Sequence, residues 1–294
     1  MPDAADDVTD AQPVPAGDVD EATRVEILSR GELEIRGRLV DASNATLLAT
    51  VTLDGVSAPC VYKPVAGERP LWDFPSRTLA RREVAAYVLS AGAGLDVVPV
   101  TVLRDGPYGT GSVQWWVDEG LVDDDGDPVS GEPGAGLVDV VPPQDLPAGW
   151  RRILDAEGID GSPVVLAHAD DPALRRMALF DVVANNADRK GGHVVRDGAG
   201  GVYGVDHGLT FNVDDKLRTV LWGWAGERLP GQDRELLAVL VRDLEGGGEV
   251  RAALEDLLAV DEVDRTAHRA RELLSGGRYP RPTYGRPPIP WPAF

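Results

Sequence analysis

The chain has 294 residues, with 29 basic and 49 acidic side chains and a formal net charge of −20. Such acidity argues against binding to nucleic acid or to an anionic membrane, because both attract clustered Lys and Arg. The single cysteine, Cys60, excludes an internal disulfide, and the lack of an apolar leader or a run of about 18 apolar residues predicts a cytoplasmic protein. Residues 1–22 are acidic and rich in Pro and Ala, which predicts a disordered tail.

Residues 23–119 predict a small antiparallel lobe with one helix. From about Val25, apolar and polar residues alternate between turn signals, so three strands are expected, with the sequences LEIRGRLV, ATLLATVTL and APCVYKP. Ser76 is then expected to cap a helix, RTLARREVAAYVLSAG. Two more strands are expected in LDVVPVTVLRDGPYGTGSVQWWVDEG, on either side of a Gly- and Pro-rich turn.

Residues 120–148 are acidic and rich in Gly and Pro, which predicts a long surface loop or an insertion beside a hinge between two lobes. Residues 149–277 predict a mainly helical lobe. Its first helix, DDPALRRMALFDVVANN, begins with an Asp cap and has Pro172 at its first position. Three more helical patterns follow, near 231–244, 248–258 and 260–275.

The last segment, residues 278–294, contains too much proline for regular structure. We expect an extended tail that packs along the body through Tyr284 and Trp291. The chain as a whole therefore predicts an α+β protein, with strands concentrated in the first half and helices in the second.

Polar residues suited to phosphoryl transfer occur in a particular order along these elements. Lys63 ends the third strand and Glu83 lies on the helix that follows. Asp188 follows a later helix in NNADRK, and His193 comes five residues after it. Asp206 ends HVVRDGAGGVYGVD, which reads as a predicted strand, Gly-rich turn and strand. A kinase-type site uses a strand lysine, a helix glutamate, an aspartate near the attacking hydroxyl and two metal ligands in this order.

Each of these residues alone has a plainer explanation. A lysine at the end of a strand usually lies in solvent, a glutamate on an Arg-rich helix usually forms an exposed ion pair, and a lone histidine is usually structural. The order of the residues is the stronger signal. The lysines add to it, because the chain has only three, Lys63, Lys190 and Lys216, and otherwise uses Arg. Lys offers a compact charge where the wide fork of Arg does not fit.

On these motifs the chain resembles the phosphatidylinositol 3-/4-kinase-like superfamily, whose wider membership includes the HipA-type bacterial protein kinases. It is more closely similar to bacterial proteins described as phosphatidylinositol-kinase-like, of unsettled substrate. The resemblance spans roughly Val25 to Ser275. It implies a bilobal protein-kinase-like fold, with a small β-rich N-lobe and a mainly helical C-lobe.

Two short motifs carry this resemblance. DRKGGH matches the catalytic loop in its Asp-Arg opening and five-residue spacing, and Asp206-His207-Gly208 matches the metal-binding Asp-x-Gly. The resemblance implies that Asp188 is the catalytic base or positions the hydroxyl, and that Asp206 is the principal metal ligand. Lys190 stands where protein kinases often carry a lysine that contacts the transferred phosphate. His207 is expected to be structural or hinge-like.

The chain departs from the family pattern at two places. His193 stands where the family has a metal-binding asparagine, and imidazole favours softer ions, so Mn²⁺ is considered beside Mg²⁺. No Gly-x-Gly-x-x-Gly loop is present, and Ser43, Asn44 and nearby backbone N–H groups are expected to contact the phosphates instead. The adenine hinge is expected at 116–118, through backbone groups of Trp116, Val117 and Asp118.

The resemblance implies an ATP-dependent phosphotransferase whose acceptor is a protein Ser/Thr or a small polyol. A membrane phosphoinositide is disfavoured as the acceptor, because the chain has no polybasic segment to approach an anionic surface. Two alternatives stay open. A pseudokinase, or nucleotide-binding regulatory module, is suggested by His193 and the missing glycine loop. Transfer of AMP is the other, and the mass of the product distinguishes it.

Overall fold

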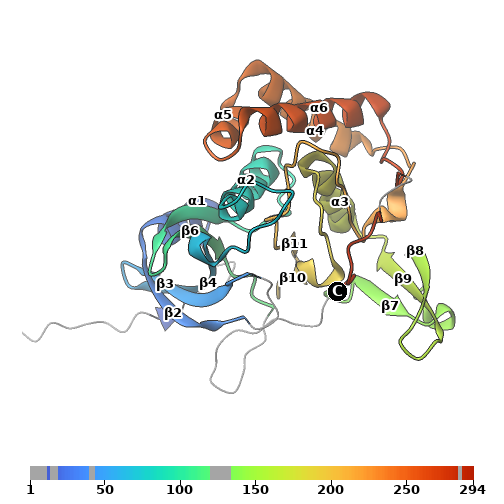
Figure 1. The fold of residues 1–294 in the computed structure, drawn as a ribbon, viewed down its shortest axis with the longest axis horizontal. Coiled ribbons are helices and arrows are strands. Elements are labelled where there is room, and N and C mark those ends of the chain that lie inside the picture. The colour runs from blue at the N-terminus through green and yellow to red at the C-terminus, as the bar shows by residue number, and fades with distance from the viewer. Residues whose placement is uncertain (1–11, 14–18, 40–43, 120–133, 284–286) are drawn as a thin grey trace, which may run out of the picture. The chain divides into compact units, whose positions relative to one another are not determined.

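The computed structural model describes residues 12–13, 19–39, 44–119, 134–283 and 287–294 (Figure 1). It divides into two compact units, Met1–Arg69 with Val100–Trp116, and Pro70–Pro99 with Val117–Phe294. The α+β class is confirmed, with antiparallel strands dominating the first half and helices the second. The helix expected in the β-rich lobe is grouped with the second unit. None of the helices among the described residues is long and apolar enough to cross a membrane.

The first unit is built on one mainly antiparallel sheet with the order β2-β3-β4-β6-β5, and β1 pairs in parallel with β4. The turn between β3 and β4 is Asp54-Gly55, with φ of 50° and 80°, the left-handed geometry that tight hairpins favour. The five expected strands are confirmed. The strands of the sheet are β1 (Gln12–Pro13), β2 (Glu32–Arg38), β3 (Leu47–Leu53), β4 (Val56–Pro64), β5 (Thr101–Gly106) and β6 (Gly109–Trp115).

Helix α1 (Glu21–Arg30) was not expected from the sequence. It begins where Asp20 accepts a hydrogen bond from Thr23 N at 2.8 Å, and it packs against β3, β5 and β6. Within the helix only Ile27 and Leu28 are buried, so its apolar face is too narrow to give a clear helical period. Of the predicted disordered tail of residues 1–22, residues 1–11 and 14–18 lie outside the described residues, and the described part includes β1 and the start of α1.

Helix α2 (Leu79–Gly92) begins later than predicted. The expected cap, Ser76, is wrong, because Arg77 has φ +66° and cannot continue into a right-handed helix. Thr78 is the residue that precedes the first helical turn, and its hydroxyl donates to Pro75 O at 2.6 Å. A short 3-10 turn, Val65–Gly67, precedes this region.

Three strands of the second unit were missed. β7 (Val138–Val141), β8 (Trp150–Glu157) and β9 (Pro163–Ala169) form an antiparallel sheet in the order β7-β9-β8. The expectation of a loop over 120–148 is therefore wrong for β7, while 120–133 lies outside the described residues. A 3-10 turn, Pro143–Asp145, follows β7. The run VVLA of β9 is apolar throughout, so it lacks the alternation that predicts a half-buried strand.

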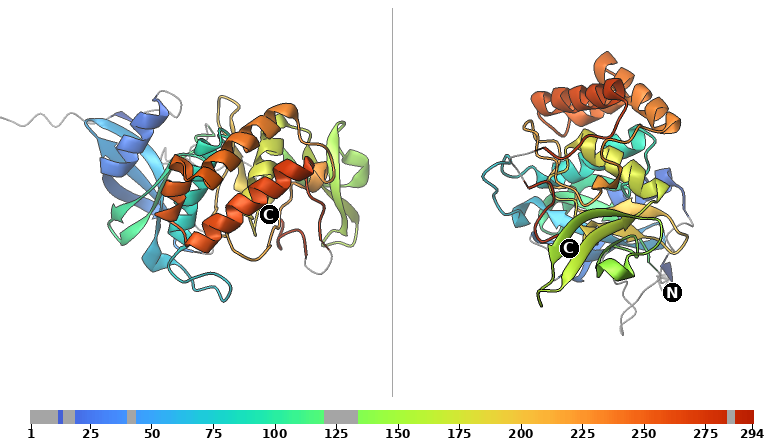
Figure 2. Two further views of the ribbon diagram at one scale, coloured as in Figure 1. Left: turned by 90° about the horizontal axis from the view of Figure 1, so that it is seen from above. Right: turned by 90° about the vertical axis from the view of Figure 1, so that its right-hand side faces the viewer.

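The four predicted helices of the second unit are confirmed as α3 (Pro172–Ala184), α4 (Gly231–Gly246), α5 (Glu249–Glu255) and α6 (Val260–Gly276). Asp171 caps α3 by accepting hydrogen bonds from the amides of Ala173 and Leu174. Helices α4 to α6 lie together on one side of α2 and α3 (Figure 2). Their buried faces share one apolar core with α3 and with the loop that carries Trp224.

The expected hairpin between the two motifs is present as β10 (Val194–Arg196) and β11 (Val202–Gly204), and 3-10 turns cover Gly191–His193 and Trp222–Trp224. The tail prediction is wrong for Trp291, whose side chain is 91% exposed. Tyr284 lies outside the described residues. At the start of this segment, the side chain of Tyr279 is buried and packs against Trp224.

Candidate functional site

The polar loop that follows α3 is shaped by two asparagines. Asn185 ends the helix in the left-handed conformation, with φ 53°, and its amide nitrogen donates to the carbonyls of Asn212 and Asp214. Asn186 accepts from Asp188 N at 3.0 Å and donates to Asp181 at 2.9 Å. The first asparagine therefore caps the helix, and the second braces the backbone of Asp188.

Arg189 joins the catalytic-loop motif to the Asp-x-Gly motif. Its side chain is fully buried, and its guanidinium contacts Asp181 on α3 at 3.0 Å. The same group donates to His193 O at 3.3 Å and Val205 O at 3.2 Å, and it lies 2.7 Å from Nε2 of His207. From the sequence, Arg189 stands out only as part of a motif. The signal for its role lies in the buried Asp181 on α3, a single acidic residue among the apolar residues of MALFDVVA.

Asp188 lies beside Lys190, with 3.4 Å between Oδ2 and Nζ. Burial raises the pKa of the Asp188 carboxyl above its usual value, and the charge of Asp206 adds to this, while Lys190 and Arg218 act in the opposite direction. A carboxylate with a raised pKa is a stronger base than an exposed aspartate. Its environment therefore suits the acceptance of a proton.

His193 and Asp206, the two residues expected to bind a metal, lie side by side, with 3.5 Å between Nε2 and Oδ2. The Asp206 side chain is 49% exposed and its backbone has φ 58°, so a strained turn presents this carboxylate to solvent. Among the described residues, no three His, Cys, Asp or Glu side chains group as a metal centre. Two protein ligands fit an ion that takes its remaining ligands from phosphate and water, as Mg²⁺ commonly does.

Glu83 lies on α2 and is 3% exposed. Its Oε2 atom accepts a hydrogen bond from His207 N at 2.8 Å, so it holds the backbone directly after Asp206. Lys63 lies on β4, in register with Ser112 of β6, and belongs to the other unit. Lys63 and Glu83 belong to different units, so the expected contact between them stays a prediction.

His207 is structural, as expected. Its ring is fully buried and lies edge-on to Phe180, with 5.2 Å between ring centroids. Because an arginine side chain only donates hydrogen bonds, Nε2 of His207 is the acceptor from Arg189. Both the ring and the backbone of this residue are therefore fixed.

The residues expected around the nucleotide base and phosphates are placed as follows. Asn44 Oδ1 accepts from Arg69 N at 2.9 Å, so this side chain binds the backbone that follows the 3-10 turn Val65–Gly67. Ser43 lies outside the described residues. The Trp116 amide donates to Pro59 O at 3.3 Å, and Asp118 O accepts from Gly198 N at 3.0 Å. The Trp116 N–H and the Asp118 carbonyl are thus hydrogen-bonded within the chain. The prediction that residues 116–118 bind adenine then applies to the other backbone groups of this stretch, including those of Val117.

The chain is similar in sequence to a known protein. No family model matches the chain. Protein Rv2133c of Mycobacterium tuberculosis (strain ATCC 25618 / H37Rv) is 50% identical over 268 residues, which cover 91% of this chain and 94% of the relative. The crystal structure of a Helicobacter pylori proinflammatory kinase, CtkA, aligns with a TM-score of 0.44 and 9% identity, over 86% of this chain and 94% of that one.

Proposed function

The chain belongs to the family of Protein Rv2133c, and we propose that it is an ATP- and divalent-metal-dependent phosphotransferase of the phosphatidylinositol 3-/4-kinase-like type. One observation carries the proposal: Arg189 ties together the loop that pairs Asp188 with Lys190 and the loop that brings Asp206 to His193. A purely structural pair of turns has no need to gather a half-buried base, a lysine and two potential metal ligands in this order.

Each residue of this pair of loops has a defined task in the proposal. Asp188 accepts a hydrogen bond from the acceptor hydroxyl, orients it and takes its proton. Lys190 offsets the negative charge that develops on the transferred phosphoryl group. His193 and Asp206 hold Mg²⁺ or Mn²⁺, an ion that neutralises charge on the phosphate oxygens when it is bound. Glu83 keeps the backbone after Asp206 in place through His207 N.

The remaining nucleotide contacts are proposed from the order of the elements alone. Lys63 holds the phosphates of ATP and is braced by Glu83. Ser43 and Asn44, with nearby backbone groups, cover the phosphates, and backbone groups of 116–118 pair with adenine. The acceptor is a hydroxyl of a protein Ser/Thr or of a small molecule. A lipid headgroup is disfavoured, because a chain with a net charge of −20 is repelled by an anionic surface.

Thermal melting with nucleotide and metal tests this proposal. A ligand present at 100 times its dissociation constant adds about 2.7 kcal/mol of stability. We expect ATP with Mg²⁺ or Mn²⁺ to raise the melting temperature of the wild type, and Asp206→Ala to remove the metal-dependent part. The exposed Asp145→Ala is the matched control and should respond as the wild type does.

The outcomes separate the alternatives. A metal-dependent shift in the wild type that Asp206→Ala lacks supports the site, and the mass of the modified acceptor then distinguishes transfer of phosphate from transfer of AMP. No shift with any nucleotide at several millimolar contradicts the proposal and favours a regulatory module.

A further inference from the structure

Residues 287–294, with the sequence PPIPWPAF, form a strap across the candidate site. Pro288 O accepts hydrogen bonds from Thr219 N at 3.0 Å and from Trp222 Nε1 at 2.9 Å. Ala293 O accepts from Gly191 N at 2.8 Å. The three donors belong to the second unit, as does the strap. They bind carbonyl oxygens of the strap and no side chain of it.

Among the donors, Thr219 lies beside the loop that carries Asp188, and Gly191 belongs to that loop. Arg189 N donates to Arg218 O and Val220 N donates to Arg189 O, both at 3.1 Å, so residues 218–220 run alongside Arg189. Thr219 N donates to the strap on the other edge of the same segment. Gly191, the last donor, comes three residues after Asp188.

Phe294 closes this end of the strap. A Cβ atom placed on Gly191 would lie 2.1 Å from Cε1 of the Phe294 ring, so the ring packs directly on the glycine backbone. The strap therefore covers the stretch between Lys190 and His193, two residues assigned tasks in phosphoryl transfer.

The contact at Trp222 follows a known mode of peptide recognition. Proline-rich segments adopt an extended helix with unpaired carbonyls, and aromatic surfaces bind them at little entropic cost. Here an indole N–H meets a carbonyl within the sequence PPIPWP. The backbone amides of Thr219 and Gly191 also donate to carbonyls of the strap. Such donors recognise an extended backbone and are indifferent to most side chains.

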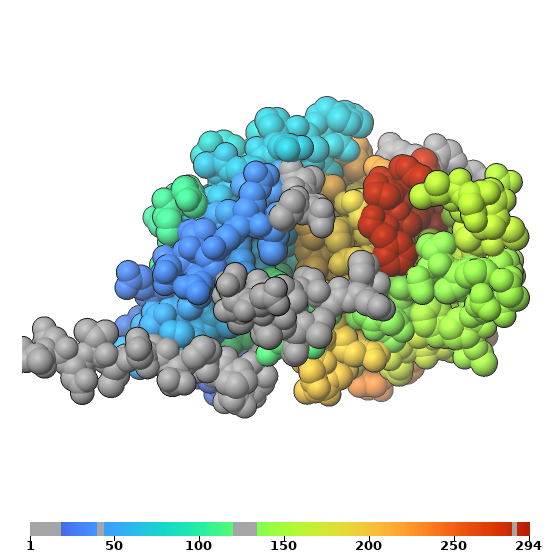
Figure 3. All heavy atoms as spheres, turned by 90° about the horizontal axis from the view of Figure 1, so that it is seen from below, coloured from blue at the N-terminus to red at the C-terminus, as the bar shows by residue number. Residues whose placement is uncertain are grey.

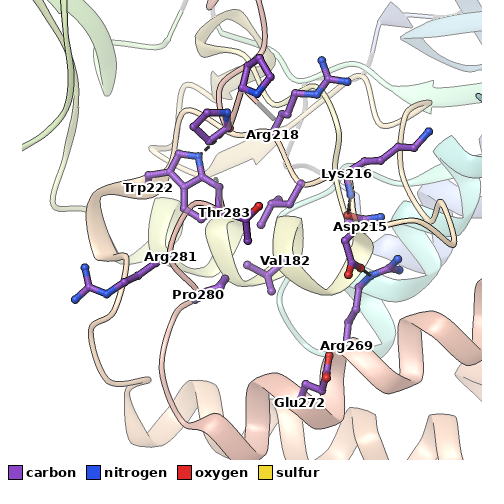
Figure 4. A pocket seen from close by; sticks show the side chains of 14 residues that line it. Val182, Asp215, Lys216, Arg218, Trp222, Arg269, Glu272, Pro280, Arg281 and Thr283 are labelled. Carbon is purple, nitrogen blue, oxygen red and sulfur yellow. Dashed lines mark hydrogen bonds and ion pairs between the residues drawn. The ribbon is translucent and has the colours of Figure 1, made fainter. Parts of the chain in front are cut away.

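The strap is only partly packed against the body. Ile289 and Ala293 contact the apolar core, whereas Trp291 is 91% exposed. The strap residues appear as red atoms at the surface in the view from below (Figure 3). Pro287 and Pro288 line a cavity of about 210 Å³ together with Trp222, Arg218 and Val182, three residues labelled in Figure 4.

We propose that Trp222, Thr219 and Gly191 form a track for an extended acceptor polypeptide, and that the strap occupies this track in the resting chain. A polypeptide bound in its place leaves the track at Gly191, next to Asp188. The role as acceptor site rests on the proposed phosphotransferase function. Binding of an extended peptide to the track does not.

Binding of the free peptide PPIPWPAF, labelled with fluorescein, tests the track by fluorescence anisotropy. The full-length double variant Ile289→Ala/Phe294→Ala loosens the strap, and we expect it to bind the peptide at least tenfold more tightly than the wild type does. Adding Trp222→Phe should weaken this binding about fivefold, the loss expected for one neutral hydrogen bond. Trp72→Phe, which removes an indole N–H from a residue that is 95% exposed elsewhere, should leave it unchanged. Equal affinity for wild type and double variant, or no effect of Trp222→Phe, overturns the proposal.

Hydrogen exchange in the unmodified chain gives a test that needs no variant. The amides of Gly191 and Thr219 are covered by the strap, while those of Arg189 and Val220 bond within the body. If the strap opens, the amides of Gly191 and Thr219 should exchange at least tenfold faster than those of Arg189 and Val220. Equal exchange at all four amides shows a fixed strap and overturns the proposal.

The acceptor role is tested separately with dephosphorylated casein as the polypeptide probe. Loosening the strap should raise kcat/KM for casein at least fivefold and leave the KM for ATP unchanged. Equal casein phosphorylation by wild type and double variant overturns the acceptor role. Peptide binding without phosphate transfer from either protein contradicts the phosphotransferase proposal and leaves the track standing.

Discussion

The Nη2 atom of Arg189 lies 2.7 Å from Nε2 of His207, so the residue after Asp188 is bonded to the residue after Asp206. This contact fixes the histidine as an acceptor at Nε2, with its ring proton on Nδ1. Arg189 also pairs with Asp181, and both side chains are fully buried. The two motifs that are eighteen residues apart in the sequence are thus held by one side chain anchored on α3.

Replacing Arg189 with Met should be strongly destabilising. It leaves the Asp181 carboxylate buried without its cation, and breaking a buried pair from one side typically costs about 3–5 kcal/mol. Denaturant unfolding measures this loss. Adding Asp181→Leu should recover part of it, because no uncompensated charge is then buried, yet metal-dependent binding of ATP should stay impaired. Recovery of ATP binding together with stability would contradict the role of Arg189 in joining the loops.

Two substitutions of Glu83 separate its observed contact from its predicted one. Glu83→Ala leaves the buried His207 N–H without an acceptor, which costs roughly 1–3 kcal/mol of stability. Glu83→Gln keeps an oxygen for that contact and should be nearly neutral in unfolding experiments. If Glu83 also braces Lys63, Glu83→Gln weakens ATP binding to about the same extent as Lys63→Met. Unchanged ATP affinity in Glu83→Gln limits the residue to its structural contact.

The order of the elements could be predicted from the sequence because its signals are local. Asp171 and Pro172 fix the start of α3, and Asp54-Gly55 fixes a hairpin, each by the conformational preference of one or two residues. Helix α1 and the strands β7 to β9 could not be predicted in this way. The burial of Ile27 in α1 and of Val165 in β9 is decided by the elements packed against them, which no short window of sequence contains.

The same distinction between local signals and long-range packing applies to the candidate site. The spacing of Asp188 and His193 is local, and the pairing of His193 with Asp206 follows from the hairpin between them. The contacts of Arg189 with Asp181, of Glu83 with His207 and of Gly191 with Ala293 join distant parts of the chain. The local signals therefore indicated the candidate residues Asp188, His193 and Asp206, whereas the contacts that hold their loops depend on long-range packing that the sequence does not show.

Asp188→Asn should stabilise the protein at neutral pH and strongly reduce turnover. Burial, the largest cause, raises the pKa of Asp188 in the folded state, so the folded state binds more protons than the unfolded state as pH rises past the ordinary value of 3.8. The ionised group therefore costs stability above that pH, and a neutral amide removes the cost. The melting temperature of the variant should exceed that of the wild type at pH 7 and match it below pH 3.8.

Turnover gives the second measurement on Asp188→Asn. An amide cannot accept the hydroxyl proton, and loss of a general base typically reduces the rate by about 10²–10⁴. ATP binding should be retained. A variant that is both less stable than the wild type and unable to bind ATP indicates a structural role for Asp188 instead.

His193→Asn should shift the metal preference toward Mg²⁺. An amide oxygen is a harder ligand than imidazole, so the ratio of ATP affinity with Mg²⁺ to that with Mn²⁺ should rise. Calorimetric titration of ATP in each metal measures this ratio. His268→Asn, on the exposed face of α6, is the matched control. An unchanged ratio removes His193 from the metal site.

The protein should lose stability in mild acid through His168. Burial lowers the pKa of this ring from 6.5 to about 4, and Nε2 accepts a hydrogen bond from Gly223 N that protonation would break. Between these pH values the unfolded state binds the proton and the folded state does not, so stability is full above pH 6.5 and falls toward pH 4. The slope is about 1.4 kcal/mol per pH unit for one proton, or about 3 kcal/mol in all. In urea unfolding across this range His168→Gln should flatten the slope, while His268→Gln should leave it as in the wild type; equal slopes in all three proteins would show that His168 is not the group responsible.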